Sequence, residues 1–242
     1  KLITVSLQTN VINLIHKINN KLNLQSRYER KSKIHIGQSN FFKGFFNSIG
    51  FYKSYANREV SSVYFDDQNY SFVKANIDGD FYRIKPRIRW YDNNFDNSNL
   101  EFKYKFGFNG FKYKDNSFNK ENLDFHKKLE FSKKKLILDY GLNLPICTKV
   151  TYQRKYLKHP SGIRLTIDKN IFASMYNSNQ NKYEFNTKKI KLPFDVIEFK
   201  YDVDLDNFFR EKIFIKLQDF PIRLTKCSKY VEAIISINTL NI

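Results

Sequence analysis

The 242-residue chain is long enough for one large domain, and its 41% apolar and 17% aromatic residues can form a core, which excludes a disordered polypeptide. A net charge of +18, from 42 basic and 24 acidic residues, is typical of domains that bind polyanions. Two cysteines are too few for a disulfide framework or a metal site and favour a reducing, cytoplasmic compartment, and no apolar stretch reaches the length of a membrane span.

The chain begins with apolar residues at helical spacing, which predict an amphipathic helix over residues 4–24. Beyond it, eight runs with a period of two predict strands, and four further segments have a helical pattern. In chain order, we expect strand 27–36, helix 38–52, strands 58–66, 81–91, 99–106 and 110–115, helix 120–140, strands 147–157, 162–172 and 194–202, and helices 205–217 and 226–236. Asn/Asp-rich segment 92–99 is expected to be a hairpin connector. No linker divides the chain, so a single domain over 1–242 is expected.

The polar faces of the predicted strands share one theme, because lysines and arginines dominate them. In YRIKPRIRWY (82–91), four cations occupy alternate positions and apolar residues occupy most of the others. The same alternation recurs in the other strands, where the polar faces carry Arg27, Glu29 and Lys31; Glu101, Lys103 and Lys105; Lys112 and Lys114; Tyr152 and Arg154; Arg164, Thr166 and Asp168; and Glu198, Lys200 and Asp202. One face of the sheet is therefore expected to be basic and the other apolar.

An α+β fold satisfies both faces if the eight antiparallel strands close into a barrel, with helices packed outside and the charged faces lining an interior channel. Two like charges about 4 Å apart cost about 4 kcal/mol at an effective dielectric of 20. A bound polyphosphate would remove that repulsion, since its oxygens accept charge-assisted hydrogen bonds. The alternative is that these faces point outward into solvent.

Eight segments in order along the chain resemble polyphosphate polymerase (VTC) domains of the triphosphate tunnel metalloenzyme (CYTH-like) superfamily. They are RYERK, VSSVYFDD, PRIRWYD, LEFKYK, VTYQRKY, GIRLTID, VIEFKYD and TKCSKYV, and they span residues 27–232. The resemblance implies an eight-stranded antiparallel tunnel that transfers the terminal phosphate of ATP to a growing polyphosphate chain, with Mn²⁺ or Mg²⁺ as cofactor.

The resemblance also implies roles for individual residues. Those matching the catalytic positions are Arg87, Arg89, Arg154, Arg164 and Lys103, and those matching substrate-binding positions are Lys31, Lys105, Lys112, Tyr152, Lys200, Lys226, Ser228 and Lys229. Glu198 matches the metal-binding glutamate, whereas Glu101 and Asp168 are expected to orient or stabilise neighbouring cations. Lys105 and Lys114 replace a His and an Arg found in other members.

Several functions remain open at this point. With water as the nucleophile, the same site would be an inorganic or nucleoside triphosphatase, and without turnover it would be a polyphosphate-binding module. A nucleic-acid-binding module would need aromatic rings beside its cations, but here they occupy the opposite strand parity. ATP, triphosphate and polyphosphate are therefore the expected ligands, nucleic acid is not expected, and a membrane-protein partner at the inner face of a membrane is left open.

Overall fold

The computed structural model describes residues 27–107, 109–115, 118, 123–177, 184–185, 189–218, 220 and 222–239, together with residues 9, 12 and 13, so the predicted helix 4–24 lies almost entirely outside the described residues. Ten strands form one antiparallel system. They are β1 (Arg27–His35), β2 (Tyr52–Phe65), β3 (Tyr82–Tyr91), β4 (Asn94–Phe106), β5 (Asn109–Lys114), β6 (Ile146–Lys158), β7 (Arg164–Asn177), β8 (Glu184–Phe185), β9 (Ile190–Lys191) and β10 (Phe194–Asp202). The eight predicted strands are thus confirmed, and β8 and β9 are additional short strands on β7.

The helices are α2 (Ser39–Ser48), α3 (Ser71–Asp78), α4 (Phe125–Tyr140) and α7 (Lys229–Thr239), together with a helical segment over 203–217. That segment runs through a 3₁₀ turn (Val203–Leu205), α5 (Asp206–Phe208), a π-helical stretch (Phe209–Phe214) and α6 (Ile215–Leu217). α3 is absent from the sequence-based expectations. It is short, and carboxylates that precede it cap it: Asp66 accepts from the Phe72 and Val73 backbone N–H groups.

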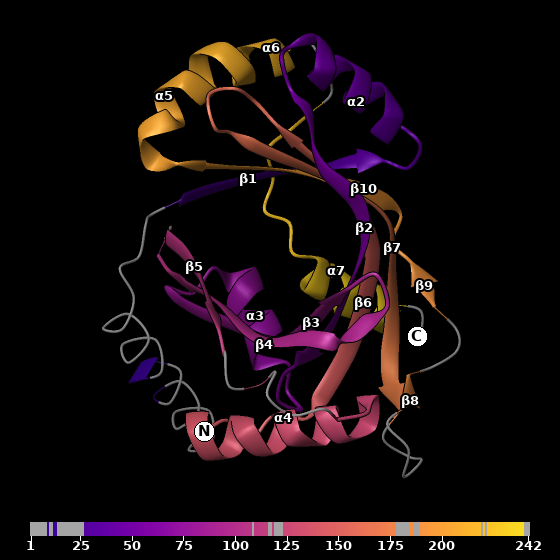
Figure 1. Cartoon of the computed structure of the whole chain (residues 1–242). Coiled ribbons are helices and arrows are strands. Elements are labelled where there is room, and N and C mark those ends of the chain that lie inside the picture. The colour runs from indigo at the N-terminus through magenta and orange to yellow at the C-terminus, as the bar shows by residue number, and fades with distance from the viewer. Residues whose placement is uncertain are drawn as a thin grey trace.

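The strands follow the order β1-β10-β7-β6-β2-β3-β4-β5 in a strongly curved sheet (Figure 1). In the part of the chain that the structure describes, no backbone pairing joins the edge strands β1 and β5, although these two strands approach each other, so the sheet is curled and closure of the predicted barrel by hydrogen bonds is not detected. β5 has six residues, and within the described ranges its backbone pairs with β4. A side-chain ion pair links the two ends instead: Lys103 of β4 donates to Glu29 of β1, with 2.6 Å between Nζ and Oε2.

Turn chemistry shifts one predicted boundary. Asp92 and Asn93 both have left-handed φ values, 53° and 58°, and form a two-residue hairpin between Tyr91 and Asn94. Most of the predicted connector 92–99 therefore belongs to β4. β2 likewise begins at Tyr52, before its expected start, and α2 ends at Ser48, earlier than expected.

Three apolar clusters hold the layers together. On the convex face, α4 covers β3 and β4, whereas α2 and the 203–217 segment cover β1, β7 and β10 (Figure 1). The third cluster lies on the concave face, where Tyr230, Ile234 and Ile237 of α7 pack against Val60, Val150 and other residues of the sheet. Among the described residues, no helix is both long and apolar enough to cross a membrane.

Candidate functional site

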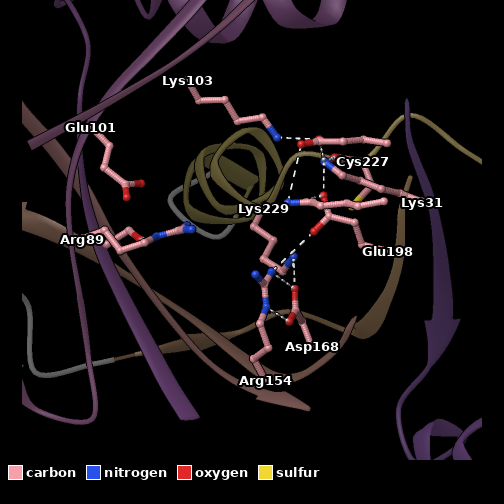
Figure 2. Close-up of polar contacts among 12 residues, drawn as sticks. Lys31, Arg89, Glu101, Lys103, Arg154, Asp168, Glu198, Cys227 and Lys229 are labelled. Carbon is pink, nitrogen blue, oxygen red and sulfur yellow. Dashed lines mark hydrogen bonds and ion pairs between the residues drawn. The ribbon is translucent and has the colours of Figure 1, made fainter. Parts of the chain in front are cut away.

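The concave face of the sheet carries the predicted cations because the strands alternate as the sequence indicates. On β3, Ile84, Ile88 and Trp90 lie in the convex core under α4, so the alternate residues Arg87 and Arg89 lie on the opposite face. Side chains of β1, β4, β6, β7, β10 and α7 join them there. We call the ionised side chains of this face the concave cluster (Figure 2).

One centre of the concave cluster is Asp168, whose side chain is fully buried. Arg154 contacts it through two bonds, Nε to Oδ1 at 2.6 Å and Nη2 to Oδ2 at 2.7 Å, and Lys229 Nζ lies 2.6 Å from Oδ2. The Tyr152 ring lies beneath both cations, 4.8 Å from Lys229 Nζ and 5.2 Å from the Arg154 guanidinium carbon. Tyr152 thus contributes a cation–π surface as well as core packing.

A second centre brings Glu29 and Glu198 together with three lysines. Lys31 Nζ lies 3.5 Å from Glu198 Oε1 and 3.6 Å from Glu29 Oε2. Lys200 Nζ lies 3.6 Å from an oxygen of each glutamate, and Lys103 contacts Glu29. The Lys31 ammonium also donates to the Cys227 carbonyl at 3.2 Å, which brings the segment before α7 against β1.

The third centre surrounds Glu101. Arg87 donates to Glu101 Oε2 through Nε at 3.1 Å and Nη2 at 2.8 Å, and Lys112 Nζ lies 3.5 Å from Oε1. Glu101 therefore orients neighbouring cations, as expected from the sequence. Arg89 is different, because its Nε donates to the Ser62 hydroxyl at 2.9 Å and no described carboxylate lies within 4 Å of it.

The cations keep these buried carboxylates ionised. Burial alone would raise the pKa of Glu101, but Arg87 and Arg89 outweigh it and lower the pKa to about 2. Burial is likewise outweighed at Glu198, where Lys200 and Lys31 hold the pKa well below its usual value. At neutral pH the concave cluster is thus a set of alternating charges rather than a set of bare cations.

The remaining predicted site residues make fewer polar contacts. Lys105 is partly buried on the same face of β4, and Ser228 accepts a hydrogen bond from Lys85 at 2.8 Å. Arg164 and Lys226 are exposed, and their side chains make no hydrogen bond or ion pair with the described residues. Arg164 shares the parity of Asp168 but lies at the start of β7, where its side chain reaches solvent.

Sequence reasoning assigned no site role to Glu29 or Lys85. Both have the strand parity of assigned residues, Glu29 that of Lys31 and Lys85 that of Arg87, so the alternation was the available signal. α7 is anchored beside them by Tyr230, which donates to Asp66 Oδ2 at 2.7 Å and stacks on Tyr64 with 4.6 Å between ring centroids.

A divalent metal has a limited set of donors here. No group of three or more His, Cys, Asp or Glu side chains in the described ranges is arranged to hold an ion. Glu198 fits a hard cation because it is ionised and faces the lysines that would hold phosphate. Phosphate oxygens would have to supply other ligands, a donor set that magnesium and manganese accept.

The sequence model of the VTC domain matches residues 7–238 of the chain. Among solved structures, the putative adenylyl cyclase HpAC1 from Hippeastrum, described as having a dominant triphosphatase activity, has a TM-score of 0.50 at 14% identity, with 87% of this chain and 95% of that one covered. The PH1819 protein from Pyrococcus horikoshii OT3 has a TM-score of 0.49 at 15% identity, covering 89% and 99%. At this identity the HpAC1 match shows a common fold alone. No curated protein matches the chain.

Proposed function

Because this chain belongs to the VTC domain family, we propose that it is a metal-dependent polyphosphate polymerase, which transfers the terminal phosphate of ATP to a growing polyphosphate chain. The observation that carries the proposal is the convergence of Arg89, Arg154, Lys31, Lys103 and Lys229 on one face, from five different elements (Figure 2). A polyanion is the ligand that such a face fits.

Phosphate binding would use the geometry already present. The planar guanidinium groups of Arg87, Arg89 and Arg154 can each present two N–H donors to phosphate oxygens, and the lysines add point charges along the chain. Arg89 has no acidic partner among the described residues. Its remaining N–H donors can therefore bind a phosphate without first breaking an ion pair with a carboxylate. We therefore assign Arg89 to the first phosphate that binds.

The chemistry asks mainly for position and charge. A terminal oxygen of the acceptor chain attacks the γ-phosphorus of ATP, the bond to the β,γ-bridging oxygen breaks, and ADP leaves with that oxygen. Arg154 and Lys229 would stabilise the charge on the transferred group, while Asp168 keeps both side chains oriented. Bound by Glu198 and phosphate oxygens, Mn²⁺ or Mg²⁺ would supply further charge neutralisation.

The test is incubation of the purified protein with ATP and Mn²⁺, with the product sized on a gel. We expect a ladder of long polyphosphate, and we expect Arg87→Ala and Glu198→Ala to abolish it. Lys149→Met is the matched control, since Lys149 lies over the Trp90 ring on the convex face. Release of orthophosphate alone would assign the site to triphosphate hydrolysis, and tight binding without turnover under any divalent metal would assign a polyphosphate-binding module.

A further inference from the structure

Lys85 differs from most cations of the concave cluster because it has no acidic partner. Lys31, Lys103 and Lys229 each lie within 4 Å of a carboxylate oxygen. Among the described residues, no carboxylate oxygen lies within that distance of the Lys85 ammonium, whose hydrogen bond goes to the neutral Ser228 hydroxyl at 2.8 Å. Lys85 is therefore a partly buried charge without a counter-charge.

The register of β3 and β4 makes this position more unfavourable. Lys85 lies directly opposite Lys103, and Arg83 lies directly opposite Lys105. Like charges placed opposite each other destabilise a sheet. Of these four cations, only Lys103 lies within ion-pair distance of Glu29 in the described part of the chain.

The cations around Lys85 come from three strands. Lys31 belongs to β1, Lys103 and Lys105 to β4, and Arg87 to β3 itself. Burial and these cations lower the pKa of Lys85 well below its ordinary value. An anion bound here would relieve both the repulsion and the lost solvation.

Arg83, beside Lys85 on the same face, also has an unused donor. Its Nη2 donates to the Gly107 carbonyl at 3.0 Å, but its buried Nε has no partner. A buried donor without a partner is unfavourable, so two cationic groups at one end of β3 lack the partners that would stabilise them.

We propose that Lys85 and Ser228 bind a phosphate group of the substrate at this end of β3 and β4, where the Lys85 ammonium has no carboxylate within 4 Å among the described residues. The inference rests on the proposed function and extends it, because it adds a site for the part of the phosphate chain that lies near the segment preceding α7. Lys85 supplies the charge, and the Ser228 hydroxyl, which now accepts from Lys85, can rotate to donate to a phosphate oxygen. The competing explanation is that Lys85 serves only to hold Ser228 in place.

The two explanations differ in what Lys85→Met does to the free protein. If Lys85 binds phosphate, an apolar side chain of similar length removes an uncompensated charge, so Tm without ligand stays equal or rises. The dissociation constant for tripolyphosphate, measured by titration calorimetry, should then increase about ten- to hundredfold, which is the scale of one charge-assisted hydrogen bond. Lys85→Arg, which keeps the charge, should recover most of the affinity, and Lys149→Met should bind like wild type.

Three other results would contradict the proposed phosphate site at Lys85. Lower Tm of Lys85→Met, or failure to fold, would show a structural role and overturn the proposal. So would unchanged tripolyphosphate affinity in a variant that folds, and in that case the proposed function would stand. If the wild type itself did not bind tripolyphosphate, the proposed function would fail together with this site.

Discussion

Arg154 and Asp168 lie directly opposite each other on β6 and β7 and form a two-point ion pair, while Lys229 at the start of α7 contacts the same carboxylate. One buried acid thus contacts two cations, and one of them, Lys229, lies far from the other along the chain. It ties the C-terminal helix to the sheet at the point where phosphate is expected.

Asp168→Asn should leave Arg154 and Lys229 buried with less counter-charge and lower the free energy of unfolding by about 3–5 kcal/mol. Urea unfolding measures this. Asp202→Asn is the control, since Asp202 pairs with Arg27 in an exposed contact that is worth under about 1 kcal/mol. Added tripolyphosphate should restore part of the loss in Asp168→Asn, and a variant as stable as wild type would contradict this account.

Glu198→Gln should separate metal dependence from phosphate binding. Losing the carboxylate removes the predicted metal ligand, so Mn²⁺-dependent turnover should drop about hundredfold or more. The same change frees Lys31 and Lys200 from a competing acid, so metal-free tripolyphosphate affinity should be retained or improved. Turnover against Mn²⁺ concentration and calorimetry without metal measure the two effects, with Glu59→Gln on the convex face of β2 as control. Full Mn²⁺-dependent turnover in Glu198→Gln would exclude its role.

Phosphate binding should become weaker as pH rises above about 7, because of Lys103. Burial and Lys31 lower the pKa of Lys103 to about 7, against the opposing effect of Glu29. Above that pH the free protein carries a neutral Lys103, and a bound phosphate favours the charged form, so binding must take up a proton. Calorimetry at pH 8 in two buffers of different ionisation enthalpy measures that uptake. Lys103→Met should show less uptake than wild type, whereas the ligand's own protonation is common to both proteins; equal uptake would contradict the prediction.

Tyr230→Phe should loosen α7 by removing its hydrogen bond to Asp66. We expect a loss of about 1–2 kcal/mol in unfolding free energy, because a buried carboxylate loses a donor. Tripolyphosphate affinity should fall as well, since Lys229 at the start of α7 depends on the position of that helix. Tyr55→Phe, at a tyrosine that is 65% exposed, should change neither quantity. A stable Tyr230→Phe protein with normal binding would show that other contacts position α7.

The alternation of residues predicted the strands and the face that each side chain occupies, because a period of two is a local property of the chain. Arg87 and Arg89 could be placed together in this way. The acidic partners of the cations could not be predicted in this way. The contact between Lys103 and Glu29, for example, depends on how β1 and β4, which are far apart in the strand order, approach each other. Nor could the parity of Arg164 show that its strand begins where the side chain meets solvent.

The carboxylates that lie among the cations of the concave cluster also affect which anions can bind there. An anion that binds to the paired cations must compete with the contacts of Glu29, Glu101 and Glu198, which stay ionised nearby. An anion that bears a single charge, such as chloride, competes with these carboxylates less strongly than a chain of phosphates does. A chain of linked phosphates brings several negative charges in a single binding event, so the protein can discriminate between ligands by their charge. A short phosphate fragment would therefore be released more readily than the chain from which it came.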